Sequence, residues 1–131
     1  MDSAICSDQS DASSVNVSAG ETVTCVFTNS QRGSISGAKL EDLDGSTVTS
    51  GDQSNILGWT IELYECAADF TGCVLSATDV TDGSGYSFTN LVSGYYQVRE
   101  VLQNGWTNLT SLFTNIVLDS GEDSTNNNFI N

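Results

Sequence analysis

Apolar and polar residues alternate in short runs along most of the chain, and clusters of Gly, Ser, Thr, Asn and Asp separate these runs. Residues 59–64 show the pattern clearly, because Trp59, Ile61 and Leu63 share one face of an extended strand. No segment has the apolar period of an amphipathic helix. Seven such runs have spacings typical of a β-sandwich: residues 34–40, 59–64, 74–78, 86–91, 95–102, 113–118 and 125–131.

The first thirty residues hold a smaller set of β-like runs, at residues 4–6, 15–17 and 22–28. Residues 15–29 and 116–131 share one pattern: an apolar run, a turn with a small residue before Gly-Glu, and a strand ending in Phe-x-Asn. An internal repeat is the plainest account of this pattern. We therefore expect residues 1–32 to be the closing strands of a preceding repeat, and residues 33–131 to be a complete repeat.

Three strands alone seldom bury enough surface to be stable. Residues 1–32 therefore belong either to a longer tandem array or to a neighbouring subunit, which they would complete by strand addition. The second arrangement would give a head-to-tail, self-assembling filament.

The charge balance excludes several classes of partner. The 131 residues carry a net charge of −14, with only Arg32, Lys39 and Arg99 as basic residues. Nucleic acids and anionic membrane surfaces would be repelled. An acidic excess usually gives solubility, and bound cations or a saline habitat are the alternatives. No apolar stretch is long enough to span a bilayer and no signal peptide is present, so we expect no membrane insertion.

The four cysteines are candidates for disulfides. Histidine and a Cys-x-x-Cys pair are both absent, which argues against zinc. Cys66 ends one apolar run and Cys73 begins the next, so they could close the mouth of a hairpin, while Cys6 and Cys25 would lie on paired strands. Two disulfides would imply an oxidising, extracellular compartment and would each stabilise the fold by ~2–4 kcal/mol. Free buried thiols are the alternative.

Signatures of catalysis are weak. Asp119-Ser120-Gly121 follows an apolar run and matches the Asp-Thr/Ser-Gly of aspartic proteases, but too little chain follows to build that fold. No histidine exists for a Ser or Cys triad, no Gly-rich phosphate loop occurs, and no carboxylate pair stands out among the acids. We therefore expect a protein that is not an enzyme.

Several spaced motifs resemble a B-type repeat of bacterial surface adhesins. They are Gly-Ser-Ile-Ser-Gly-Ala-Lys-Leu-Glu-Asp-Leu-Asp-Gly from residue 33, Gly-Trp-Thr-Ile from residue 58, Tyr-Ser-Phe-Thr-Asn-Leu-x-x-Gly-Tyr-Tyr-x-Val-Arg-Glu from residue 86, and Asn-Gly-Trp-Thr from residue 104. They resemble the serine-aspartate-repeat B-like and collagen-adhesin B-like (Cna-B-type) domains. The resemblance implies an all-β, prealbumin-like or Ig-like sandwich over residues 33–131. It also implies a stalk or adhesin module, often in tandem, rigidified by calcium or by a Lys–Asn isopeptide bond.

The resemblance places calcium ligands in the acidic loop after the opening strand. Calcium binds several oxygen ligands on a flexible loop. The implied ligands are Asp42, Asp44, Ser46, the Val48 carbonyl, Ser50 and Asp52 or Gln53, with Asp79 and Asp82 from a second loop. The family has Asn or Asp where this chain has serine at 46 and 50, and Glu at 53, so the ligand charge is lower here. The alternative is a set of polar turns in which Asp caps the backbone.

The isopeptide pattern of the family implicates Lys39, Glu100 and Asn131. A buried lysine must be neutral to attack an amide, and a buried carboxyl group can shuttle the protons. Glu100 shares its strand face with two apolar residues, so it should point inward, where it needs a partner. Lys39 is the only lysine available. The family has Lys-x-Asp, whereas Asp42 comes three residues after Lys39, so an unlinked salt bridge or a solvated lysine is the alternative.

The sequence therefore predicts a non-catalytic structural or adhesive module of an extracellular surface protein, stalk or filament, at the cell surface or cell wall. Its partners would be neighbouring repeats or subunits of the same protein. The alternative is a ligand-binding module for a carbohydrate or a host protein, with Tyr95 or the hairpin loop at residues 67–72 as the contact.

Overall fold

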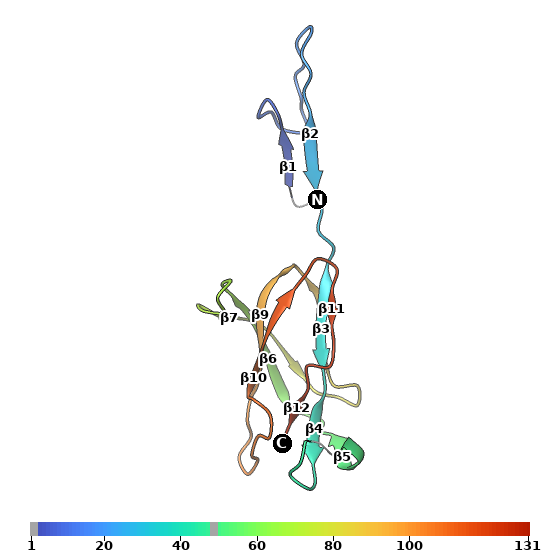
Figure 1. The fold of residues 1–131 in the computed structure, drawn as a ribbon, viewed down its shortest axis with the longest axis vertical. Helices are drawn as coiled ribbons and strands as arrows, with labels where there is room; N and C mark the ends of the chain where they lie inside the picture. Colours follow the sequence, from blue (N-terminus) through green and yellow to red (C-terminus); the bar gives the residue numbers. More distant parts are fainter. Residues whose placement is uncertain (1–2, 48–49) are drawn as a thin grey trace. The chain divides into compact units, whose positions relative to one another are not determined.

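The structure is a computed structural model that describes residues 3–47 and 50–131, without the side chain of Ser50. The chain divides into two compact units, Met1–Gln31 and Arg32–Asn131, and each is described by itself (Figure 1). Within the described residues the regular structure is β, apart from one 3-10 turn, η1 (Ser50–Asp52). None of the described helical structure has the length and apolar character needed to cross a membrane.

One layer of the second unit is a four-stranded antiparallel sheet in the order β10-β9-β6-β7. Strands β6 (Thr60–Cys66) and β9 (Gly94–Glu100) lie in its centre, and β7 (Val74–Val80) and β10 (Phe113–Leu118) form its edges. Alternate residues of each strand point inward, as in Ile61 and Leu63, which are fully buried. This layer supplies the glutamate of the site described below.

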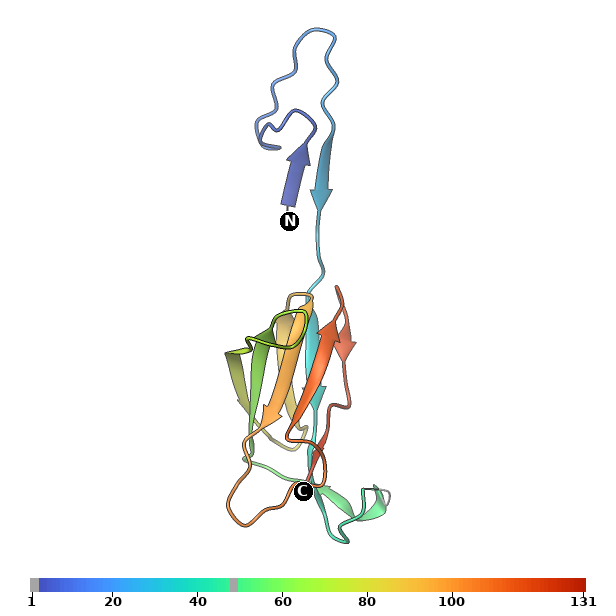
Figure 2. The ribbon, with the colours of Figure 1, turned by 60° about the vertical axis from the view of Figure 1, so that its left-hand side comes forward.

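The other layer brings the beginning and the end of the second unit together. The opening strand is interrupted at residue 38, giving β3 (Gly33–Gly37) and β4 (Lys39–Asp42). Strand β3 pairs antiparallel with β8 (Tyr86–Leu91), and β4 pairs antiparallel with β5 (Gln53–Asn55). The closing strands β11 (Asp123–Ser124) and β12 (Phe129–Ile130) pair parallel with β3 and β4 (Figures 1 and 2).

Two glycines allow the closing segment to approach the opening strand this closely. A Cβ atom on Gly33 would lie 2.2 Å from the Glu122 carbonyl oxygen, and one on Gly37 would lie 2.2 Å from the Asn127 carbonyl oxygen. Neither position has room for a side chain. The spacing Gly-Ser-Ile-Ser-Gly therefore leaves Ile35 free to enter the core while both flanking positions receive the returning backbone.

The core lies between the two layers and is formed by the inward positions of the predicted runs. Its buried apolar residues are Ile35, Trp59, Ile61, Leu63, Tyr86, Phe88, Tyr96, Val98, Ile116, Leu118 and Phe129. Because the strands supply these residues from both ends of the second unit, closing the core requires the last strand as well as the first.

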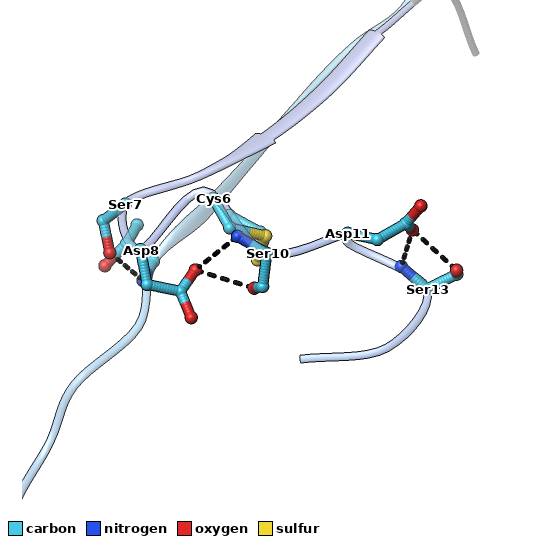
Figure 3. Close-up of a disulfide and its surroundings, with 8 residues drawn as sticks. Cys6, Ser7, Asp8, Ser10, Asp11 and Ser13 are labelled. Atoms are coloured by element: carbon cyan, nitrogen blue, oxygen red, sulfur yellow. Dashed lines mark hydrogen bonds between the residues drawn. A yellow bond between two sulfur atoms is a disulfide. The ribbon is translucent and has the colours of Figure 1, made fainter. Parts of the chain in front are cut away.

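The first unit is a two-stranded antiparallel sheet of β1 (Ser3–Cys6) and β2 (Cys25–Thr28), joined by the Cys6–Cys25 disulfide. Its turns are capped by acidic side chains (Figure 3). Asp8 accepts hydrogen bonds from the N–H and hydroxyl of Ser10, and Asp11 does the same for Ser13. These hydrogen bonds hold the pKa of both carboxyl groups below the ordinary value.

The predicted all-β sandwich is confirmed, with several local differences: no predicted run covers β5, and the run at residues 22–28 is shortened to β2. The run at residues 34–40 is split because the Ala38 N–H donates to Asn128 Oδ1, 2.8 Å away, where pairing passes from β8 to β5. Within the run at residues 125–131 only β12 forms, and β11 lies before residue 125. The run at residues 15–17 forms no strand, since no described segment pairs with it. That the first unit is the end of a preceding repeat stays a prediction.

A buried lysine, glutamate and asparagine beside an acidic loop

Lys39 is the first residue of β4 and its side chain is completely buried. Its Nζ atom lies 3.1 Å from Oε2 of Glu100, whose side chain is also completely buried. The ammonium also lies 4.7 Å from the centroid of the Trp59 ring, a cation–π distance. The predicted inward orientation of Glu100 and its proximity to the only lysine are therefore seen in the structure.

Asn131 reaches the same part of the core from the closing segment. Phe129 lies opposite Lys39 in the parallel pairing of β12 with β4. Asn131 extends this ladder, since its N–H donates to the Leu40 carbonyl at 3.1 Å and its carbonyl accepts from the Asp42 N–H at 2.9 Å. Phe129 and Asn131 share a face of the extended chain. Both are buried, so the Asn131 amide lies on the inward face, diagonal to Lys39.

The polar atoms of this cluster are poorly satisfied. Lys39 Nζ, both carboxylate oxygens of Glu100, and both side-chain polar atoms of Asn131 have no hydrogen-bond partner among the described groups. The contact between Lys39 and Glu100 is thus a close approach of charges without the alignment of a hydrogen bond. A buried polar group without a partner costs about 1–3 kcal/mol, so this arrangement is expensive for a purely structural core.

Burial also moves the protonation of the pair toward its neutral forms. Desolvation lowers the pKa of Lys39, and the neighbouring Glu100 opposes this shift only in part. Desolvation likewise raises the pKa of Glu100, with partial opposition from Lys39. A neutral amine is a nucleophile, and a protonated carboxyl group can give and take a proton. The buried residues therefore include an amine and a carboxyl group that are both shifted toward their neutral forms, and a primary amide.

The acidic loop brings three of the predicted calcium ligands together. One carboxylate oxygen from each of Asp42, Asp44 and Asp52 lies within 4.8 Å of the others. The Ser46 N–H donates to Asp42 at 3.0 Å and to Asp44 at 2.7 Å, and Gln53 Nε2 donates to Asp42 at 3.1 Å. Partial desolvation by itself raises the pKa of Asp42, but these donated hydrogen bonds outweigh it and the pKa is lowered.

This group fits a calcium ion in its chemistry. All of its ligand atoms are oxygens, as calcium prefers. Oδ1 of Asp52 is buried and has no described hydrogen-bond partner, so it is available to a cation. Gln53 donates to Asp42 through its side-chain amide nitrogen, and the oxygen of the same amide is a further candidate ligand. The fit depends on the opening strand and β5, because their pairing places Asp42 opposite Gln53.

Of the other predicted ligands, Asp79 and Asp82 bond backbone N–H groups elsewhere. Val48 and the side chain of Ser50 lie outside what the structure describes. Asp79 accepts the N–H groups of Val80 at 2.9 Å and Ser87 at 2.8 Å, and Asp82 accepts the Ser84 N–H at 2.7 Å. Both aspartates therefore cap local backbone, as the alternative of polar turns describes.

Both predicted disulfides are present, Cys6–Cys25 and Cys66–Cys73. The second closes the loop between β6 and β7, whose Phe70 packs edge-on against Tyr95 with ring centroids 5.6 Å apart. Tyr95, the suggested contact for a ligand, is 37% exposed.

Sequence reasoning missed one residue of the buried cluster, Trp59, which lies against Lys39. Its ring also packs edge-on against Trp106 at 5.4 Å between centroids. The signal was in the chain, because Trp59 shares the inward face of Ile61 and Leu63. The alternation predicts that Trp59 points inward, but it does not predict which residue of another strand the Trp59 ring contacts.

No protein-family model matches the chain, and no curated protein matches it. Among solved structures, the minor pilin GBS52 of Streptococcus agalactiae matches with a TM-score of 0.55 and 19% identity, over 87% of this chain and 57% of that one. A streptococcal ancillary pilin matches with a TM-score of 0.55 and 20% identity, over 85% and 34% of the two chains. The Bacillus anthracis TIE protein matches with a TM-score of 0.53 and 14% identity, over 77% and 16%.

These similarities establish the fold: an Ig-like β-sandwich of the kind found in pilins of Gram-positive bacteria. The chain spans less than two thirds of the length of each of these three proteins.

Proposed function

We propose that this chain is a non-catalytic structural module of an extracellular surface filament, stalk or adhesin. Its second unit would be locked by an isopeptide bond between Lys39 and Asn131. The observation that carries this proposal is the buried contact of Lys39 with Glu100, together with the buried Asn131 that follows β12, the closing strand paired with the strand of Lys39. The similarity of the fold to pilins supports the same class of function.

The bond would form by transamidation without any other reactant. Neutral Lys39 Nζ attacks Cγ of Asn131, while protonated Glu100 donates a hydrogen bond to the amide oxygen. Glu100 then passes the proton that Nζ loses to Nδ2 of Asn131, and the C–N bond of the side-chain amide breaks. Ammonia leaves, the new Nζ–Cγ amide remains, and Glu100 recovers its proton. Of the buried atoms that had no partner, Nζ of Lys39 is then bonded and Nδ2 of Asn131 is released, while Glu100 keeps a hydrogen bond to the oxygen of the new amide.

The position of the bond suits a mechanical role. It would close a loop that contains residues 40–130. A force pulling the two ends of the second unit would pass through residues 33–39, across the new amide and out at Asn131. The enclosed strands would carry no load, so the sandwich could stay folded under tension.

Intact mass spectrometry tests the proposal. We expect the reduced chain to be lighter than its sequence mass by one ammonia. The variants Lys39→Met and Glu100→Gln should have full sequence mass, because they lack the nucleophile or the proton shuttle. Asn115→Ala is a matched control: Asn115 lies in β10, where its side chain bonds Gln97, so this variant should still lose ammonia. A wild-type chain of full mass would leave only a buried ion pair and would refute the cross-link.

We further propose that Asp42, Asp44 and Asp52 bind calcium and stiffen the loop between β4 and β5. The close carboxylates and the unpartnered Asp52 oxygen support this proposal. At a calcium concentration of 100 times Kd, binding would stabilise the second unit by about 2.7 kcal/mol.

Thermal melting in calcium and in a chelator tests the metal site. We expect calcium to raise the Tm of the wild type and of Asp82→Asn, and to have no effect on Asp52→Asn. Equal melting temperatures for the wild type in calcium and in chelator would remove the metal from the proposal. Loss of the response in Asp82→Asn would instead place the second loop in the site.

A further inference from the structure

The turn that ends the apolar run in the first unit is repeated in the second. The Glu21 carboxylate accepts the Ser18 N–H at 2.9 Å, and the Glu122 carboxylate accepts the Asp119 N–H at 2.8 Å. In return, each glutamate N–H donates to the carbonyl of the same partner, at 3.0 and 3.1 Å. The glycine before each glutamate has a positive φ, 84° and 75°. The repeat in the sequence is therefore also a repeat in three dimensions.

Equivalent residues of the two segments differ sharply in burial. We name residues 15–29 the first closing segment and residues 116–131 the second closing segment. Val17 is 60% exposed, whereas its equivalent Leu118 is 1% exposed. Phe27 is 55% exposed, whereas its equivalent Phe129 is fully buried. The first closing segment thus carries the side chains of a sandwich core without the strands that would cover them.

The second closing segment is held along both edges of β12. On one edge, the Phe129 N–H donates to the Ala38 carbonyl at 3.0 Å, beside the opening strand. On the other edge, the Leu109 N–H donates to the Ile130 carbonyl at 2.8 Å. β12 therefore lies between the opening strand and the segment that precedes β10.

Strand β2 of the first unit is held along one edge only. The Ser7 N–H donates to the carbonyl of Thr24, which lies opposite it in the continued β1–β2 register. Antiparallel alternation then turns the N–H groups of residues 26 and 28 toward β1, and those of Phe27 and Asn29 toward the other edge. No strand in the described part of the chain pairs with that other edge.

We infer that residues 15–29 close a second β-sandwich, whose opening strands lie N-terminal to residue 3 in a longer polypeptide. A strand of the β3–β4 type would pair parallel with β2 along its free edge, in the register of β4 on β12. Strands of the β6 and β9 type would cover Val17 and Phe27. Asn29, which follows β2 as Asn131 follows β12, would then lie at the end of this second ladder.

The order of segments along the chain favours this source over a second copy of the protein. A closing segment comes first, and only Ser30, Gln31 and Arg32 separate it from the opening strand of the complete unit. Repeats in tandem give this order. In a second copy the edge of β4 is already paired with β12, so the second copy would have to lose its own closing segment first. The inference does not depend on the Lys39–Asn131 cross-link.

Hydrogen exchange in an extended chain tests the inference. A duplicate of residues 32–108 is joined in front of residue 3. This junction follows from the repeat: Leu109 bonds Ile130 and Ser3 pairs with Thr28, and Thr28 is the equivalent of Ile130, so residue 3 takes the place of residue 109. We expect the amides of Phe27 and Asn29 to exchange at least ~100-fold more slowly than in the present chain, since they gain backbone acceptors in a folded core. The amide of Phe129 in the complete unit should not change.

Two variants of the extended chain give matched controls. Val17→Asp should abolish the new protection, because its equivalent Leu118 is buried. Val26→Asp should keep it, because the equivalent residue, Asn128, is polar and exposed. Unchanged exchange at Phe27 overturns the inference, whether the added strands fold or not. Protection of Phe27 in the present chain together with dimers in sedimentation would assign the free edge to a second copy and overturn it as well.

Discussion

Replacing Lys39 and Glu100 together by methionine separates a cross-linked core from a buried ion pair. Methionine is close to lysine in volume, is somewhat larger than glutamate and packs flexibly, so cavity effects should be small. A buried ion pair replaced by apolar residues is often neutral or stabilising, by about 1–4 kcal/mol. If only an ion pair were present, the double variant would therefore be at least as stable as the wild type.

A cross-link gives the opposite sign. A bond between residues 39 and 131 closes a loop of about 90 residues, which in the chain-entropy treatment stabilises the folded state by about 5 kcal/mol. The double variant loses this contribution. For a unit of about 100 residues, a loss of about 5 kcal/mol lowers the Tm by roughly 20–40 °C.

A thermodynamic cycle with Asn131→Ala removes the remaining ambiguity. This single variant cannot form the bond but keeps the Lys39–Glu100 contact. In the Asn131→Ala background we expect the double methionine change to be neutral or stabilising, whereas in the Asn131 background it should cost about 5 kcal/mol. Denaturant unfolding of the four proteins, with the second unit followed by tryptophan fluorescence, measures both effects. Equal effects in both backgrounds would refute the argument from the cross-link.

Other parts of the structure give independent predictions. Gly37→Ala should destabilise the second unit by more than about 2 kcal/mol, because the added Cβ would meet a backbone carbonyl, while Gly83→Ala should be nearly neutral in denaturant unfolding, since nothing lies near its Cβ. Replacing Cys66 and Cys73 together by serine should cost about 2 kcal/mol in the same assay, as expected for a short closed loop. In Asn131→Ala the lysine is not bonded, and the free energy of unfolding of the second unit should rise with pH between the lowered pKa of the buried lysine and its ordinary pKa of 10.5. In this range the unfolded chain keeps the proton that the buried lysine has lost. A flat pH profile of urea midpoints in the same range would contradict the lowered pKa.

The alternating runs predicted most of the strands because paired strands place their alternate side chains on the same face of a sheet. Residues 86–91 and 113–118 became β8 and β10 with the predicted bounds. Residues 15–17 have the same alternation and formed no strand. Strand formation needs a partner edge, and the pattern within a segment does not say whether one is present.

Some positions of the candidate site could be predicted from the sequence and others could not. The inward position of Glu100 followed from the faces of its own strand, and its pairing with Lys39 followed from the lack of another lysine. The capping role of Asp79 was left as one of two alternatives, because one of its donors is the Ser87 N–H of β8, and only the fold brings that group to the carboxylate. The same acidic sequence can cap turns or bind a cation, and only the folded loop decides which carboxylates meet.

The sequence by itself determined the all-β class, the inward faces of the strands and the two cysteine pairs, since period and hairpin position are local properties. Only the tertiary structure decided that the closing segment runs parallel beside the opening strand, where the backbone of Asn131 bonds Leu40 and Asp42 on the strand of the buried lysine. This pairing joins the two ends of the second unit. Contacts so distant along the chain depend on how all the intervening strands pack, and no local pattern encodes them.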